Sequence, residues 1–383
     1  MKKIFICNLF KYYTTRCVWH GFEKLGYKVI LKDYESPEDK FTDPELEDRL
    51  SKDILSMDPE FVFTVNYNPI VSRACYKSNV KYVAWTYDTP MDLPGTDTME
   101  LPTNHIFIFD HGEYQKYRNM GFETVYYLPL ASVFHERFTP SVREDYLFDV
   151  SLIGNLYKAT YPLLKDRLDK YYIGFLDGIM SAQRGIYGSY FILDLLRERK
   201  EEVKSINEKT GIKLSPEQIS YSLAAYMTYL DRLSLMAMMS KRFNTALFTE
   251  GMDIKEKDVM KSLHVLPKVD YYKEMPGAFR KTKINLNPPF RAVWSAIPQR
   301  ALDIMSSGGF LLSGYTAELA YYFKNDEELV LYDSVEDAVV KAQFYLKHDD
   351  IRERIKMAGY EKVKSEFRYE DRLTAIIETV VKQ

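Results

Sequence analysis

The stretch of sequence that decides the fold is residues 283–313, KINLNPPFRAVWSAIPQRALDIMSSGGFLLS. An apolar strand over 284–287 leads into a proline-rich loop. An amphipathic helix over 299–306 follows, and Gly308-Gly309 separates it from a second apolar strand. A strand, a helix and a strand in this order predict a parallel βαβ unit.

The same alternation of short apolar runs and amphipathic stretches extends outward over the whole chain. Six strands are expected in the first part: Lys3–Cys7, Tyr27–Leu31, Glu60–Val65, Lys81–Thr86, His105–Phe109 and Thr124–Leu128. Six more are expected in the second part: Phe148–Ile153, Ala246–Thr249, Leu263–Leu266, Ile284–Asn287, Gly309–Ser313 and Leu329–Tyr332. Strands separated by helices at this spacing predict an α/β protein with two parallel sheets.

The domain organisation follows from where this rhythm breaks. A short polar link around Pro140 separates an N-terminal domain, 1–140, from a second domain, 145–366. Residues 161–241 show helical patterning without a strand, so we expect a helical insertion in the second domain. The insertion would shape a substrate pocket or a homodimer contact, and the sequence leaves both open. The remaining residues, 367–383, form a helix that we expect to pack back on the N-terminal domain.

Composition and charge exclude several classes of protein. The 383 residues are 46% hydrophobic and 28% charged, as in ordinary globular domains. A net charge of −3 argues against broad nucleic-acid binding. Three cysteines without a C-x-x-C pair support neither a disulfide framework nor a zinc site, so we expect a cytoplasmic protein. The N-terminal apolar run is too short for a signal peptide, and no run is long enough for a transmembrane helix.

Two nucleotide-binding signatures are absent from the sequence. The dinucleotide fingerprint G-x-G-x-x-G and the P-loop G-x-x-x-x-G-K-[ST] do not occur. Their absence weakens the oxidoreductase and nucleotide triphosphatase interpretations of two successive α/β domains.

Several motifs instead resemble the CgeB-like (spore-maturation) glycosyltransferase family. The helix pattern R-x-x-[DE] occurs at Arg300 and Asp303, and it leads into a small residue followed by Gly308-Gly309 and a buried strand. The element W-x-x-D-[ST]-P occurs in WTYDTP at 85–90, followed by LPLA at 128–131 and FDVSLIGN at 148–155. Each motif is weak alone, but their order and spacing make the resemblance fairly specific.

The resemblance implies a fold and an activity. The fold would be GT-B, two Rossmann-like domains facing each other across a cleft. The activity would be transfer of a sugar from a nucleotide diphosphate donor, by default a UDP-sugar, to the hydroxyl of a protein, polysaccharide or lipid-linked acceptor. No D-x-D metal motif occurs, so we expect a metal-independent enzyme without a cofactor. A sugar-nucleotide epimerase or hydrolase of the same fold and a non-catalytic sugar-binding module are the alternatives.

Donor binding without a metal depends on cations, backbone N–H groups and helix N-termini near the diphosphate. The expected donor-binding residues are Gly154, Asn155, Lys158, Tyr271, Asn287, Arg291, Arg300, Asp303, Gly308 and Gly309. Related enzymes carry a ribose-binding glutamate where this chain has Asp303, and a second one where it has Ser295. Structural alternatives exist for several of these residues: a helix C-cap at the two glycines, an Arg300–Asp303 ion pair, a turn at Asn287 and a solvated Lys158.

The candidate general bases lie in the N-terminal domain. Asp88 follows an apolar strand, where ligands gather in parallel sheets, and would accept the proton of the acceptor hydroxyl. His20, on the first helix, and His111, after another strand, rank behind it. A loop hydrogen bond for Asp88 and structural roles for both histidines are the competing interpretations.

Overall fold

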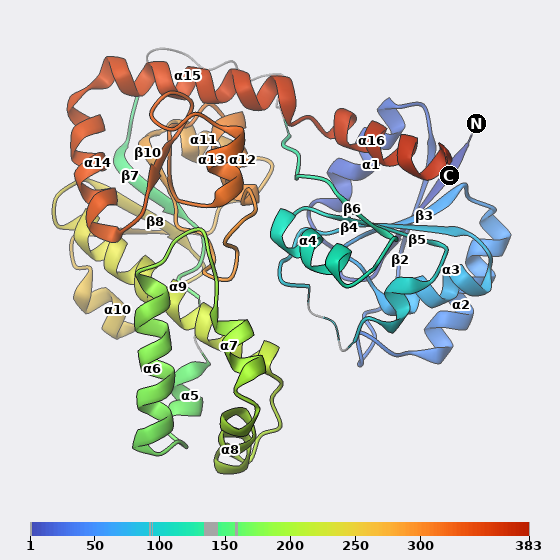
Figure 1. The fold of residues 1–383 in the computed structure, drawn as a ribbon. Coiled ribbons are helices and arrows are strands. Elements are labelled where there is room, and N and C mark those ends of the chain that lie inside the picture. Colours follow the sequence, from blue (N-terminus) through green and yellow to red (C-terminus); the bar gives the residue numbers. More distant parts are fainter. Residues whose placement is uncertain (1, 92, 94, 134–144, 158–159, 383) are drawn as a thin grey trace. The chain divides into compact units, whose positions relative to one another are not determined.

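A computed structural model of the chain describes residues 2–91, 93, 95–133, 145–157 and 160–382. The chain divides into two compact units, one formed by Met1–Phe134 with Val363–Gln383 and the other by His135–Lys362. Each unit contains a parallel six-stranded sheet (Figure 1). The prediction of two parallel α/β series is therefore confirmed. Most of the predicted link, residues 139–144, lies outside the described residues.

The first sheet has the strand order β2-β1-β3-β4-β5-β6. Its strands are β1 (Lys3–Asn8), β2 (Lys28–Asp33), β3 (Phe61–Val65), β4 (Lys81–Trp85), β5 (Asn104–Ile108) and β6 (Val125–Tyr127). Ile6 on β1 lies opposite Leu31 on one side and Phe63 on the other. All six strands predicted for this part are present.

Helices cover both faces of the first sheet. They are α1 (Thr15–Lys24), α2 (Pro44–Met57), α3 (Pro69–Lys77), the short 3-10 helix η1 (Asp97–Glu100), α4 (His111–Asn119) and α16 (Tyr369–Lys382). Alternate strand residues such as Val62 and Ile106 share a core with α2, α3 and α4, while Phe61 and Phe63 contact Phe22 of α1. The strand period of two sends neighbouring side chains to opposite faces.

The C-terminal helix α16 packs against α1 within the first unit. Gly21 of α1 makes this approach close, because an added Cβ there would lie 2.4 Å from Leu373 Cδ1. Lys24 also pairs with Glu370 at 2.9 Å, and Tyr369 places its ring edge-on to Trp85 at the end of β4.

The second sheet has the order β12-β11-β10-β7-β8-β9. Its strands are β7 (Phe148–Ile153), β8 (Thr245–Thr249), β9 (His264–Pro267), β10 (Thr282–Asn287), β11 (Leu311–Gly314) and β12 (Val330–Tyr332). Numbered within this unit, the order is 6-5-4-1-2-3, which is the doubly wound Rossmann order. All six strands predicted for this part are present.

Residues between β7 and β8 form the predicted helical insertion. Its helices are α5 (Tyr161–Lys165), α6 (Lys170–Arg184), α7 (Ile192–Glu198), α8 (Lys200–Thr210) and α9 (Pro216–Ser240). The long helix α9 starts at a capping box made by Ser215 and Gln218, and its 25 residues span ~37 Å. Its first half belongs to a core formed by the insertion, and its last turns, from Leu235, belong to the core of the sheet. The helix therefore extends beyond the sheet edge at which β7 ends.

The remaining helices complete the second unit. They are α10 (Ile254–Val259), α11 (Met275–Arg280), α12 (Gln299–Ser306), α13 (Ala317–Tyr322), α14 (Val335–Lys347) and α15 (Asp349–Glu366). Ile284 and Leu286 of β10 share the core with α9 and α14, whereas Asn285 points to the opposite face and donates to the Phe279 carbonyl oxygen of α11 at 3.0 Å. Within the described residues, no helix is long and apolar enough to cross a membrane.

Candidate functional site

The strand order of the second unit marks one position at its carboxyl edge. The sheet reverses its winding between β7 and β10, and ligands of doubly wound folds bind outside the carboxyl ends of the two strands at this switch point. Gly154 and Asn155 follow β7, and Pro288 follows β10. Gly154 has φ = 150°, in the region that favours glycine.

Three residues selected from the sequence meet beside this edge. Tyr271 donates its hydroxyl hydrogen to Asp303 Oδ1 at 2.8 Å, and Arg300 Nη1 lies 3.4 Å from Asp303 Oδ2. Gln299 Nε2 donates to the same Oδ1 at 2.9 Å. Hydroxyl, amide and guanidinium donors therefore converge on the buried Asp303 carboxylate.

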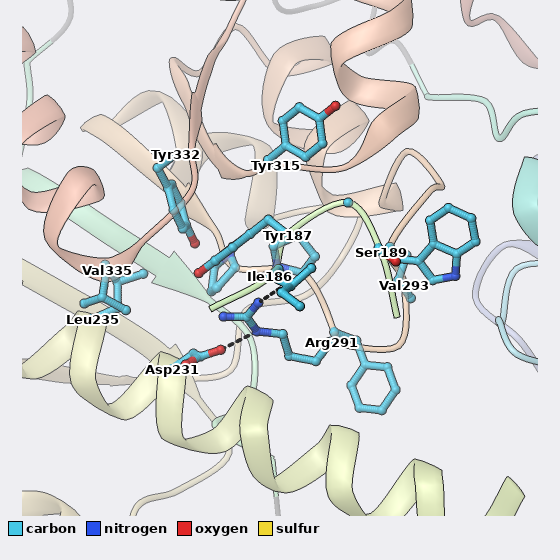
Figure 2. A pocket seen from close by; sticks show the side chains of 15 residues that line it. Ile186, Tyr187, Ser189, Asp231, Leu235, Arg291, Val293, Tyr315, Tyr332 and Val335 are labelled. Carbon is cyan, nitrogen blue, oxygen red and sulfur yellow. Dashed lines mark hydrogen bonds and ion pairs between the residues drawn. The ribbon is translucent and has the colours of Figure 1, made fainter. Parts of the chain in front are cut away.

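Arg291 is engaged within the protein. Its Nε forms a 2.5 Å ion pair with Asp231 on α9, and its two terminal nitrogens donate to the carbonyl oxygens of Ile186 and Arg184. Figure 2 shows the guanidinium between Asp231 and the Tyr187 ring, whose centroid lies 4.0 Å away. Its side chain is only 9% exposed, so this arginine fastens the insertion to the loop after β10.

The pocket in Figure 2 lies where the insertion meets the carboxyl edge. It is lined by the loop 186–189, by α9, by residues 288–291 and by residues at the ends of β11 and β12, among them Tyr315 and Tyr332. Gly188 has φ = 75°, and a Cβ there would lie 2.6 Å from Tyr315 Cε1. Aromatic rings therefore form much of the wall of this pocket.

Asn155, Asn287, Gly308 and Gly309 make local contacts within the second unit. Asn287 Nδ2 donates to Ser313 Oγ at 2.9 Å, and Thr249 Oγ1 donates to Asn155 Oδ1 at 3.3 Å. Gly308, with φ = 75°, follows the end of α12. A Cβ on Gly309 would lie 2.8 Å from Asn285 Nδ2, so the helix and the strand approach closely there. Lys158 lies outside the described residues.

Sequence reasoning missed Arg232 at this edge. Its Nη1 donates to the Asn155 carbonyl oxygen, and its Nη2 donates to the Pro288 carbonyl oxygen at 2.8 Å. Asp231 and Arg232 are the only charged residues between Glu217 and Lys241, in an otherwise apolar or small-residue helix. That isolation is the signal that could have identified them.

The first unit has its own cluster at the carboxyl edge. Asn66 follows β3 with φ = 62°, and its Nδ2 donates to Asp88 Oδ2 at 2.7 Å. Asn66 Oδ1 in turn accepts from the backbone N–H groups of Tyr87 and Asp88. Desolvation raises the pKa of the Asp88 carboxyl, although the hydrogen bond from Asn66 partly offsets this effect. Asp88 therefore has both a loop hydrogen bond and a proton affinity above that of a free aspartate.

The two histidines of this unit lie on helices. His20 is exposed on α1, with Nδ1 3.4 Å from Glu23 Oε2 and Arg16 Nε 3.4 Å from its Nε2. His111 is the first residue of α4 and packs edge-on against Tyr127. The sequence also missed Glu113, a buried acid whose pKa is raised to about 7, first by desolvation and then by the neighbouring Asp110 charge. Its Oε1 accepts the Met91 backbone N–H at 2.7 Å.

Comparisons with known proteins identify the fold and one domain of the chain. Residues 249–378, about a third of the chain, match the family described as Glycosyl transferase-like. This region includes Tyr271, Arg300 and Asp303. No curated protein matches the sequence.

Solved structures match over the whole chain. Sucrose-phosphate synthase from Thermosynechococcus elongatus has a TM-score of 0.61 at 7% identity, covering 100% of this chain and 99% of its own. HepE from Anabaena, in complex with UDP-glucose, has a TM-score of 0.57 at 8% identity and 100% coverage of both chains. The galactosyltransferase WaaB of the lipopolysaccharide outer core has a TM-score of 0.55 at 11% identity, covering 99% of each.

The chain therefore has the GT-B fold with a glycosyl transferase-like domain, and the class of protein is a glycosyltransferase. The finer resemblance to CgeB-like enzymes stays a prediction.

Proposed function

We propose that the protein transfers a sugar from a nucleoside diphosphate donor, a UDP-sugar by default, to an acceptor hydroxyl. The observation that carries this proposal is the Tyr271–Asp303–Arg300 cluster beside the switch point of a Rossmann-ordered sheet. A carboxylate can accept hydrogen bonds from ribose hydroxyls, and an adjacent guanidinium suits phosphate. HepE and T4 phage BGT, two proteins of similar fold, were solved with UDP-glucose.

The donor-side roles follow from this chemistry. Asp303 would accept hydrogen bonds from the ribose, with Tyr271 and Gln299 holding its carboxylate in place. Arg300 would stabilise the negative charge that develops on the departing diphosphate. Arg300 would supply the positive charge that a metal supplies in other enzymes, and the sequence lacks D-x-D. We therefore propose that transfer does not require a divalent metal.

The acceptor-side role is assigned to Asp88. A base must accept the proton of the acceptor hydroxyl as the new glycosidic bond forms. Asp88 is exposed at the end of β4, is held by Asn66 and has a raised pKa. His20 is the weaker candidate because it lies away from the strand ends, on the solvent side of α1. His111 stands at the start of α4, after β5, and remains the second choice.

A product assay tests the function against both alternatives. The protein is incubated with a panel of UDP-sugars, with and without candidate acceptors, and with and without chelator, while UDP and sugar products are quantified. We expect acceptor-dependent release of UDP that chelator leaves unchanged. A changed sugar nucleotide or free sugar without acceptor would indicate the epimerase or hydrolase. Donor binding without any product across the panel would indicate a binding module, and loss of turnover with chelator would overturn metal independence.

A further inference from the structure

Arg232 differs from Arg184, Arg291 and Arg300 at the same edge because carbonyl oxygens, rather than a carboxylate, hold it. Its hydrogen bonds go to the carbonyl oxygens of Asn155 and Pro288, and its guanidinium carbon lies 4.8 Å from the centroid of the Tyr157 ring. Its Nε is buried and has no hydrogen-bond partner. None of the carboxylates in the described part of the chain forms an ion pair with it. Carbonyl dipoles and a ring face orient the charge without neutralising it.

Each of the neighbouring arginines has a carboxylate partner. Arg184 and Arg291 both pair with Asp231, at 2.9 and 2.5 Å, and Arg300 pairs with Asp303 at 3.4 Å. Desolvation lowers the pKa of Arg232, and the positive charge of Arg300 contributes in the same direction. A bound anion would stabilise the charged form of Arg232, because it would compensate for desolvation and offset the positive charge of Arg300.

Arg232 lies at the switch point. One of its terminal nitrogens contacts the chain directly after β7, and the other contacts the chain directly after β10. Gly154 lies alongside, since a Cβ built there would be 3.4 Å from Arg232 Nη1. A glycine beside a cation at the carboxyl edge permits a phosphate to approach both the backbone and the guanidinium.

We propose that Arg232 binds the diphosphate of the sugar donor at the β7–β10 switch point, together with Arg300. The inference rests on the proposed function and deepens it, since it names the group that holds the leaving diphosphate. During transfer, the bond between the anomeric carbon and the β-phosphate oxygen breaks, and its electron pair stays on that oxygen. A guanidinium in place beforehand stabilises this charge without reorganisation.

The proposal also gives the helical insertion a function. Arg232 lies between the part of α9 that belongs to the insertion core and the part that belongs to the sheet core. Its neighbour Asp231 fastens the same turn to the insertion through Arg184 and to the β10 loop through Arg291. The insertion therefore positions the diphosphate-binding cation, rather than serving only as an appendage of the domain.

Calorimetry with uridine, UMP and UDP tests the proposal on the full chain. The variants are Arg232→Gln and Arg232→Lys, with Arg242→Gln as the matched control, an exposed arginine just beyond the end of α9. We expect Arg232→Gln to weaken UDP binding by roughly 10- to 100-fold, the range of one charge-assisted hydrogen bond, while uridine binding changes little. Arg232→Lys should recover part of the loss, and Arg242→Gln should bind as the wild type does.

The pattern across the three ligands separates the outcomes. A loss that grows with the number of phosphates supports phosphate binding. An equal loss for uridine and UDP would show that Arg232 only holds the two loops in place, and would overturn the proposal. Unchanged UDP binding by a folded Arg232→Gln, checked by circular dichroism, would overturn it while leaving the proposed function intact. A wild-type chain that does not bind UDP would overturn both the proposal and the UDP-sugar donor of the proposed function.

Discussion

In the first unit carboxylates held by neutral donors lie at the carboxyl edge of the sheet, and in the second unit a group of arginines lies around the β7–β10 switch point. Asp33, Asp88 and Glu113 receive hydrogen bonds from neutral donors, namely Asn8 Nδ2, Asn66 Nδ2 and the Met91 N–H. In the second unit four arginines at the edge face two aspartates: Arg184, Arg232, Arg291 and Arg300 against Asp231 and Asp303. The folds are alike, but the two edges suit different ligands.

The difference has a simple chemical consequence. A carboxylate held by neutral donors keeps its ability to accept a proton, and desolvation raises the pKa of two of these groups, Asp88 and Glu113. An excess of guanidinium charge matches a diphosphate, which is a leaving group that needs stabilisation. Glycosyl transfer requires both functions, so the comparison is consistent with an acceptor role for the first unit and a donor role for the second.

The largest expected effect tests the carboxylate edge. Asp88→Asn should reduce the transfer rate by roughly 10²- to 10⁴-fold, the usual contribution of a general base, because an amide cannot accept the proton. Donor affinity should not change, since Asp88 belongs to the first unit. Steady-state kinetics and UDP calorimetry measure the two quantities, with the exposed Asp58→Asn as the control. A variant that retains the wild-type rate would make His111 the next candidate to test.

The arginine edge is tested next through its buried counter-ion. Asp231→Ala leaves Arg184 and Arg291 without their shared carboxylate and should lower the unfolding free energy of the second unit by about 3–5 kcal/mol. Urea titration of the purified chain measures this change. Asp194→Ala is the matched control, because that carboxylate is 77% exposed and its ion pair should contribute less than about 1 kcal/mol. Equal effects of the two variants would contradict a buried network at this edge.

The third prediction concerns the dependence of stability on pH in the first unit. The pKa of Glu113 is raised from 4.5 to about 7, so the folded chain binds this proton more tightly than the unfolded chain does. The unfolding free energy should therefore fall as pH rises from about 4.5 to 7, by up to about 3 kcal/mol, and no further above that range. Glu113→Gln keeps the acceptor for the Met91 N–H and should flatten this part of the profile. An unchanged slope in the variant would assign the dependence to other groups.

The smallest expected effect concerns the ribose contact. Asp303→Ala should weaken UDP binding by about 1.5–3 kcal/mol, the value of a charge-assisted hydrogen bond, without unfolding the chain. Asp303→Asn keeps an oxygen for Tyr271 and separates loss of charge from loss of packing. Calorimetry with circular dichroism reports both. Unchanged affinity in folded Asp303→Ala would reduce this residue to an ion-pair partner of Arg300.

Much of the fold could be predicted because the relevant signals are local. All twelve predicted strands are present, since apolar runs of strand length and the helices between them are properties of neighbouring residues. The signals that start a helix are equally local. At the start of α2, for example, the Asp43 side chain accepts the Leu46 N–H, and Pro44 is the first helical residue. The last turns of α9, however, were included in the predicted insertion, although they pack on the second sheet, because one continuous helix gives no sign of where its partner changes.

The same distinction between local signals and tertiary contacts applies to the candidate site. The sequence by itself determined that Tyr271, Arg300 and Asp303 belong to one α/β unit, and the last two lie three residues apart on one helix face. Only the tertiary structure decided which arginine keeps an unpaired charge. Arg291 precedes a helix in a proline-rich loop and was the natural choice, but Asp231, sixty positions earlier, neutralises it, while Arg232 reaches two carbonyl oxygens at the switch point. Whether an arginine has a carboxylate partner depends on its neighbours in space, and those neighbours come from segments that only folding brings together.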